Sequence, residues 1–461
     1  MQNEQSTLTG YPSIDKPWMK YYSEEAINKP LPNSTIYEYL WENNKNYLDS
    51  TALIYLNKKT SFKQMFHSID NVARAFLHIG VKEGEVVAIC MPSMPETIYS
   101  LYALNKIGAV PDLIDPRSNM SDLSFFLRES NAKVLVVVDS IIDKIQLDKE
   151  NTVIENIITV SPVSSDIIYS EKTICIENEG KNIVHEKTWE KFISEGEYEL
   201  LKIHNYLEKS LSVIIHTGGT TGRAKGIMLS NENINAIAHS YKHVMSYSRG
   251  DVLLDVIPPF ASYGLCTSIH MPLSLGITVV LIPKFLIEDF GTLIIRYKSN
   301  YIVGVPSFLI GMLNDKKLKN IDLSFLKCVA CGGDKLEKNN EEKLNDFLKL
   351  HGTDVPVIKG YGMSEMSSTA VTCTNTTTAN KQNTVKRPKA QVAKISGVTV
   401  RTSTDGTAKV IKLPSGKKKI TIPMVVKIDD VKYMIVSVGK KAFKGMKKMP
   451  LSVSIQNSML I

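Results

Sequence analysis

No stretch of this sequence combines enough length and apolarity to cross a membrane. The most apolar window, residues 271–287, is broken by two prolines, a glycine and a lysine (Pro272, Gly276, Pro283 and Lys284). We therefore predict a buried core segment there and no membrane span. The first 25 residues also lack the apolar core of a secretory signal, which indicates a cytoplasmic protein.

Cysteine is scarce, with six residues in a chain of 461. Cys328 and Cys331 form a Cys-x-x-Cys pair, but no second pair and no nearby histidine completes a set of four zinc ligands. The sequence therefore predicts reduced, mostly buried thiols.

Acidic residues are almost missing from the end of the chain. From Lys381 onward there are 18 basic and 3 acidic residues, whereas the preceding part has 37 basic and 44 acidic ones. This contrast predicts two units of different origin. The tail lysines also lack aromatic neighbours for base stacking, which favours a solvated basic face over binding to nucleic acid or an anionic surface.

Length and ordinary hydrophobic content predict a soluble protein of two to four domains. We expect a large domain over residues 1–371, with two subdomains. Residues 372–404 begin with a Thr- and Asn-rich stretch that has little to bury, which predicts a linker. Residues 405–461 are expected to form a small β-rich module.

Within residues 1–371, apolar runs alternate with amphipathic stretches, as in α/β folds whose strands are joined by crossover helices. The continuous β-branched run 133–138 is typical of a strand covered on both faces. Residues 95–107 and 121–129 are predicted helices, the second with Ser121 as its N-cap. Further strands are expected at 85–90, 227–229, 252–257, 278–282, 301–305, 326–330 and 355–358, and further helices at 231–246 and 337–350.

A glycine- and threonine-rich loop follows the apolar run 213–215. Its residues are His216, Thr217, Gly218, Gly219, Thr220, Thr221, Gly222, Arg223, Ala224, Lys225 and Gly226. Glycines let successive backbone N–H groups converge, hydroxyls donate to phosphate or ligate Mg²⁺, and cations balance the charge. The pattern predicts a phosphate-binding loop, with a mobile surface turn as the alternative. It differs from the common P-loop because two residues separate Gly222 from Lys225.

Two later stretches also follow predicted strands, where ligands collect in α/β sheets. They are Gly332, Gly333 and Asp334, and then Gly360, Tyr361, Gly362, Met363, Ser364 and Glu365. Tyr361 can stack on a base, Ser364 can donate to a phosphate and Glu365 can offer an oxygen to Mg²⁺. Taken alone, each stretch is more often an ordinary turn.

Together, the order and type of these stretches resemble the adenylate-forming (AMP-binding) superfamily, which includes acyl-CoA synthetases, luciferases and peptide-synthetase adenylation domains. Residues 217–226 are similar to the family's phosphate loop, with Ala224 in place of its proline, and residues 361–365 match its Tyr-Gly-x-Thr/Ser-Glu motif. Further similar segments are Met91–Glu96, Lys106–Ala109, Gly304–Ser307 and the pair Gly332–Gly333. The resemblance covers residues 10–371 and implies the large domain of the adenylate-forming fold, with mixed sheets flanked by helices.

The resemblance implies a two-step acid–thiol ligase. A carboxylate attacks the α-phosphate of ATP to give an acyl-adenylate and pyrophosphate, and the thiol of CoA or of phosphopantetheine on an acyl-carrier protein then takes the acyl group. By matched position, Thr220, Lys225 and Glu365 are the catalytic residues, and Glu365 with Thr220 binds Mg²⁺. The residues implied to hold ATP are Thr217, Gly218, Gly219, Thr220, Thr221, Gly222, Lys225, Gly332, Gly333, Asp334, Gly360, Tyr361, Gly362 and Ser364.

The sequence departs from the family pattern at two places. Segment 259–264 resembles the family's acyl-pocket segment, but Ala261 stands where a histidine is usual. After Ser367 we find no counterpart of the family's ribose-binding aspartate, hinge arginine or adenylate-stabilising lysine. Without a lysine domain that closes over the site, impaired turnover is expected.

The tail has β-rich runs at residues 409–413, 419–423 and 432–436. Residues 437–445 resemble one unit of bacterial surface leucine-rich repeats, and isolated repeats cannot bury their face. A plain small β module is the alternative.

Three functions stay open at this stage: an acyl-adenylating ligase, a catalytically inactive nucleotide- or acyl-binding protein, and a fusion whose tail is a binding module. The sequence names neither the acid, nor the thiol acceptor, nor the oligomeric state.

Overall fold

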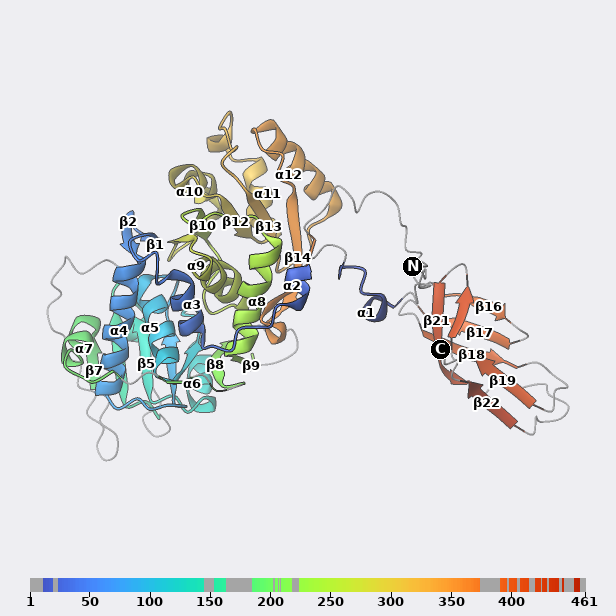
Figure 1. The fold of residues 1–461 in the computed structure, drawn as a ribbon, viewed down its shortest axis with the longest axis horizontal. Coiled ribbons are helices and arrows are strands. Elements are labelled where there is room, and N and C mark those ends of the chain that lie inside the picture. Colours follow the sequence, from blue (N-terminus) through green and yellow to red (C-terminus); the bar gives the residue numbers. More distant parts are fainter. Residues whose placement is uncertain are drawn as a thin grey trace. The chain divides into compact units, whose positions relative to one another are not determined.

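The computed structural model describes residues 11–19, 24–144, 153–162, 185–201, 204–205, 207, 209–217, 224–373, 390–395, 398–403, 407–413, 419–423, 425–428, 431–438, 442 and 452–456. The chain forms two compact units (Figure 1). The larger unit is Tyr22–Thr376, and the smaller one combines Met1–Tyr21 with Thr377–Ile461.

A seven-stranded sheet organises the first half of the larger unit. Its order is β7 (His185–Thr188), β6 (Asn156–Val160), β5 (Val134–Val138), β3 (Val86–Cys90), β4 (Val110–Leu113), β8 (Leu211–His216) and β9 (Gly226–Ser230). All neighbours are parallel except β8 and β9. Every residue of β5 is buried, as its continuous apolar run predicts.

An eight-stranded sheet organises the second half. Its order is β15 (Ser368–Cys373), β14 (Val357–Met363), β13 (Cys328–Cys331), β12 (Tyr301–Gly304), β10 (Val252–Asp255), β11 (Thr278–Leu281), β1 (Thr51–Tyr55) and β2 (Lys58–Ser61). Only the outermost pairs, β14–β15 and β1–β2, are antiparallel. The strand β14 extends five residues beyond the predicted end at Ile358, so Tyr361 and Gly362 lie on a strand and not, as expected, in a loop.

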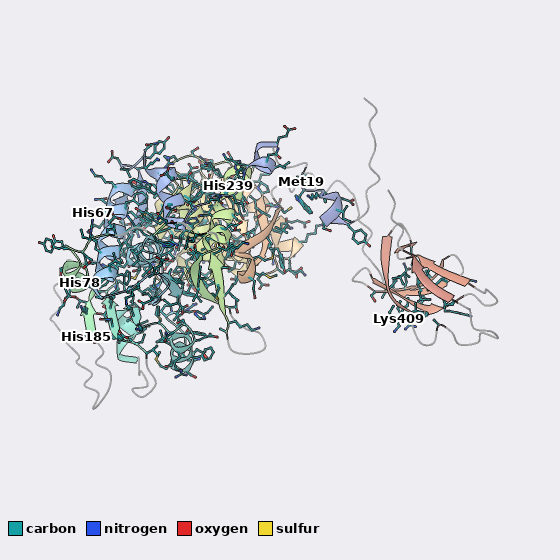
Figure 2. All side chains as sticks on the ribbon, turned by 60° about the horizontal axis from the view of Figure 1, so that its bottom comes forward. Met19, His67, His78, His185, His239 and Lys409 are labelled. Atoms are coloured by element: carbon teal, nitrogen blue, oxygen red, sulfur yellow. The ribbon has the colours of Figure 1, made fainter. Side chains whose placement is uncertain are left out.

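Helices cover both sheets, and several of them pack against one another: α3 (Ile36–Asn44), α5 (Pro95–Lys106), α8 (Asn231–Val244) and α9 (Met271–Ser274) (Figure 1). The remaining helical segments of this unit are α2 (Glu24–Asn28), α4 (Phe62–His78), α6 (Met120–Glu129), η2 (Asp139–Lys144), α7 (Trp189–Glu195), η3 (Gly264–His270), η4 (Ile287–Asp289), α10 (Phe290–Tyr297), α11 (Pro306–Leu313), η5 (Lys316–Leu318), α12 (Lys338–Leu350) and η6 (Ser364–Met366). Side chains fill the space between these ribbons (Figure 2). One buried core cluster contains residues of both sheets, among them Val87 and Val279, so the two halves share a core.

Helix starts follow from local capping. Capping boxes begin α3 (Thr35 with Glu38), α4 (Ser61 with Gln64) and α8 (Ser230 with Asn233). At α6 the predicted N-cap Ser121 is wrong, because the Asn119 side chain accepts the Asp122 N–H and the helix begins at Met120.

The smaller unit contains α1 (Pro12–Asp15) and two small sheets. The first has the order β16 (Val392–Ile395), β17 (Val398–Thr402), β18 (Thr407–Lys412), β21 (Val431–Val438) and β20 (Val425–Ile428); the second pairs β19 (Lys419–Pro423) with β22 (Ser452–Gln456). Strands β16 and β17 occupy part of the range 372–404 where a linker was expected. Most of the predicted repeat unit, residues 437–445, lies outside the described residues.

The five cysteines among the described residues form no disulfide with one another, and four of them are buried. Burial raises the pKa of Cys328 to about 12 and that of Cys331 to about 11, so neither thiol is a reactive thiolate. No helix among the described residues is long and apolar enough to span a membrane.

Candidate active site

The predicted phosphate loop is the connection of an antiparallel hairpin. Strands β8 and β9 pair His216 with Gly226, and one step further the Thr217 N–H donates to the Lys225 carbonyl at 3.1 Å. Both ends of the loop are therefore fixed by backbone pairing. The Lys225 side chain is exposed and forms no ion pair with the described residues. The loop residues Gly218, Gly219, Thr220, Thr221 and Gly222 lie outside the described residues.

The Gly332–Asp334 stretch leaves the carboxyl end of β13. Its first residue is tied to the neighbouring strand β12, since the Gly332 N–H donates to the Gly304 carbonyl at 3.0 Å. Gly333 has a φ of +77°, in the left-handed region that favours glycine. A Cβ on Gly332 would lie 2.9 Å from the Tyr263 ring, so this position also needs glycine. The Asp334 side chain is exposed beyond this turn.

The residues of the tyrosine–glutamate motif lie on β14 and η6. Strand β14 is parallel to β13, with Cys331 opposite Lys359, so Gly332 and Gly360 follow adjacent strand positions at the same edge of the sheet. The Tyr361 side chain is 63% exposed, which leaves its ring available for stacking. Ser364 receives a hydrogen bond from the Ser262 hydroxyl at 3.3 Å.

The two predicted motifs meet in space although about 140 residues separate them. Strand β9, which follows the phosphate loop, contacts η6, which carries Glu365. This contact joins the edge of the seven-stranded sheet to that of the eight-stranded sheet. The described parts of the two motifs, β9 after the loop and η6 after β14, are therefore close enough to contribute to one candidate site.

Glu365 is suited to a hard cation. Its carboxylate is exposed and has no hydrogen bond or ion pair with the described residues. Mg²⁺ keeps most of its waters and commonly takes one or two carboxylates together with substrate phosphates, so a single free carboxylate fits it. A dedicated protein cage is not needed, and the described residues contain no cluster of three or more metal-ligating side chains.

A small cavity of about 40 Å³ lies behind the nucleotide motifs. The cavity lining includes residues of α8, of η3 and its N-terminal end, and of the ends of β13, β14 and β15. Among them are Tyr241, Tyr263, Cys331, Gly360 and Thr372. Tyr241 and Thr372 share a hydrogen bond of 3.1 Å between their hydroxyls. Burial raises the pKa of Tyr263 far above its usual value, so its hydroxyl stays neutral and donates to the Gly304 carbonyl at 3.4 Å.

Two sets of contacts near the site were not predicted, although segment 259–264 and His216 were named from the sequence. The Ser262 hydroxyl donates to Ser364 and the Tyr263 hydroxyl to the Gly304 carbonyl, while buried Asp112 pairs with His216 at the start of the loop. An aspartate within the otherwise apolar stretch 109–114 was a signal of this pair, because a buried carboxylate needs a partner.

Comparison with known proteins agrees with this geometry. The profile of the family described as "AMP-binding enzyme" matches residues 40–403. The chain belongs to the AMP-binding enzyme family. The match extends beyond residue 371 and includes β16 and β17.

Curated relatives of the chain are CoA ligases. It is 28% identical over 365 residues to a long-chain-fatty-acid–CoA ligase of Bacillus subtilis, covering 76% of this chain and 64% of the relative. It is 26% identical over 328 residues to 4-coumarate–CoA ligase-like 8 of Arabidopsis thaliana, covering 70% of this chain and 56% of the relative. The chain thus spans about three-fifths of the length of these curated relatives.

Solved structures show the same fold. An anthranilate CoA ligase in complex with anthranoyl-AMP superposes with a TM-score of 0.63 at 20% identity, covering 75% of this chain and 63% of that one. The N-terminal domain of FACL13 from Mycobacterium tuberculosis gives a TM-score of 0.59 at 18% identity, covering 73% and 78%. The larger unit therefore has the adenylate-forming fold, with mixed sheets flanked by helices.

Proposed function

We propose that this chain activates a carboxylic acid with ATP, forming an acyl-adenylate and releasing pyrophosphate. The observation that supports the proposal is the contact between β9, which follows the predicted phosphate loop, and η6, which carries Glu365. Family membership supports ATP as the donor, and a related structure of o-succinylbenzoate CoA synthetase from Bacillus subtilis holds ATP and a magnesium ion.

In this proposal each described residue has a physical task. Lys225 pairs with phosphate oxygens, since its ammonium is exposed and has no competing carboxylate among the described residues. Glu365 would hold Mg²⁺, and the exposed ring of Tyr361 would stack on adenine beside Gly332 and Gly333. The metal would supply positive charge near the α-phosphate, and the residues of the chain would position the nucleotide and the acid.

The acid is proposed to enter the cavity lined by Tyr241 and Tyr263. The cavity is small and mostly apolar, and the neutral Tyr263 hydroxyl and Thr372 are among its few polar groups. Transfer of the acyl group to CoA or to a carrier phosphopantetheine is the second step proposed, from the names of the relatives.

The test is acid-dependent exchange of labelled pyrophosphate into ATP, run with a panel of aromatic, short-chain and long-chain acids. Exchange with at least one acid, abolished in a Lys225→Ala/Glu365→Ala double variant, is the expected result. Calorimetry of Mg–ATP binding separates the alternatives: binding without exchange for any acid supports a nucleotide-binding protein that does not turn over. Absence of binding overturns both.

A further inference from the structure

A buried histidine–aspartate pair lies at the neck of the phosphate loop, and the proposed chemistry does not use it. Asp112 is fully buried in β4, and His216 is the last residue of β8. The His216 Nε2 and the Asp112 Oδ1 are 2.7 Å apart. In the tautomer that carries the proton on Nε2, the imidazole donates this hydrogen bond to the carboxylate.

The pair holds the imidazole in one orientation. Strands β4 and β8 are parallel neighbours with Asp112 opposite Ile214, so the hydrogen bond ties the end of β8 diagonally to β4. The Phe126 ring packs on the imidazole with 3.9 Å between ring centroids. Gly226 packs near the ring as well, where an added Cβ would lie 3.6 Å from His216 Cε1. His216, the last residue of β8 before the loop, is therefore held in place by contacts with β4, α6 and β9.

The Asp112–His216 pair stabilises the fold less than a pair of apolar side chains would at the same position between β4 and β8. Among the described residues, the Asp112 Oδ2 and the His216 Nδ1 are buried and have no hydrogen-bond partner. Two apolar side chains would fill the same position between strands without burying these polar atoms. Residues that lower the stability of the fold in this way are expected at positions that a function requires.

We propose that Asp112 and His216 are positioning residues for the phosphate loop. By fixing His216, the pair sets the position of Thr217, whose N–H donates to the Lys225 carbonyl at 3.1 Å, and thereby positions the two described ends of the loop proposed to bind a nucleoside triphosphate. The inference rests on the proposed function, because the ligand of the loop is the ATP of that proposal. Neither residue touches substrate; both act through the loop backbone.

The test uses three variants and one matched control. His216→Phe leaves Asp112 unpaired and is expected to lower the melting temperature as well as ATP affinity. Asp112→Val/His216→Phe removes both polar groups, so it is expected to regain melting temperature without regaining ATP affinity. Asp112→Asn keeps an acceptor for Nε2 and is expected to rank closest to the native chain. His239→Phe, at another buried histidine with an unpartnered Nε2, is the control for loss of an imidazole.

The decisive measurement is the Kd of Mg–ATP together with the KM values for ATP and for the acid in pyrophosphate exchange. For the double variant we expect the ATP values to rise about tenfold to a hundredfold, as for a misplaced binding group, while the KM for the acid changes less than about twofold. A double variant with native ATP values overturns the inference and leaves the pair a purely structural element. A native chain that neither binds Mg–ATP nor exchanges pyrophosphate instead refutes the proposed function itself, and the inference with it.

Discussion

At the scale of single residues, the candidate site is marked by charges that have no partner in the described part of the fold. Lys225 and Glu365 are exposed at the two motifs that β9 and η6 bring together. Some exposed lysines and glutamates elsewhere form surface pairs, such as Lys338 with Glu342 on α12. The unpaired charges fit a ligand that supplies both phosphate and a cation.

Replacing Lys225 by alanine is expected to lower pyrophosphate exchange by about a hundredfold, the usual effect of removing one preorganised stabilising group. Lys343→Ala, which removes an exposed lysine on α12, should leave the exchange rate unchanged. Equal rates in the two variants would contradict the role given to Lys225.

Asp255 makes the stability of the larger unit depend on pH. The carboxyl is fully buried at the end of β10, and burial raises its pKa to about 8 from an ordinary value of 3.8. Between these two values the folded chain holds a proton that the unfolded chain has released. Its contribution to the free energy of unfolding is therefore present below about pH 4 and is lost as the pH rises to about 8.

Asp255→Asn should remove this titration. We expect the loss of melting temperature between pH 5 and pH 8 to be smaller in the variant than in the native chain, measured by calorimetric or fluorescence melting at several pH values. The same pH dependence in both proteins would show that Asp255 does not hold a proton in the folded state.

At the scale of elements, the β14–β15 hairpin positions Tyr361 and Glu365. Its strands approach so closely that a Cβ on Gly362 would lie 1.4 Å from the Ser368 carbonyl oxygen. Gly360, two residues earlier on β14, has no atom within 3.8 Å of the Cβ position. Ser367 and Ser368 have φ values of 56° and 101°, so the turn that closes the hairpin is already strained.

Gly362→Ala is expected to force the hairpin apart and to lower the free energy of unfolding by about 2 kcal/mol or more, with loss of ATP binding. Gly360→Ala should stay within about 1 kcal/mol of the native stability, because its added methyl meets only ordinary contacts. Chemical denaturation of both variants checks the contrast, and equal stabilities would show that the hairpin accommodates a methyl group at Gly362.

Elements with a clear apolar pattern were predicted from the sequence. Strand β5 and helix α5 lie within two residues of their expected bounds, because the first has a continuous apolar run and the second has apolar residues at three-residue spacing. The extension of β14 through Tyr361 was missed, since its glycines pair only because β15 returns alongside. The pair Asp112–His216 was missed because 104 residues separate its members, and only the order of strands makes them neighbours.

At the scale of the whole molecule, the larger unit has its own buried cores. They are built from residues of Tyr22–Thr376 alone, whereas the core of the smaller unit is a separate cluster around Val400 and Val410. Each unit can therefore fold on its own contacts. The charge contrast led us to expect two units, with residues 1–21 in the larger one, whereas these residues group with Thr377–Ile461. Strands β16 and β17 were not predicted because the few apolar residues of 392–402 alternate over a very short range.

A fragment of residues 22–376 is expected to unfold in one cooperative transition and to bind Mg–ATP with the Kd of the full chain. Calorimetric melting and titration of the purified fragment check this. A fragment that is molten, or that binds ATP much more weakly than the full chain, would show that the smaller unit contributes to the site.

The central claim is that the loop at Thr217–Lys225 and the turn at Glu365 form one adenylating site. Acid-dependent pyrophosphate exchange by the full chain tests it most directly, because the reaction requires ATP, Mg²⁺ and the acid at the same place. We predict exchange that depends on the acid and falls to background in the Lys225→Ala/Glu365→Ala double variant. Exchange that is equal in the native chain and the double variant, or that is absent with every acid, would contradict the claim.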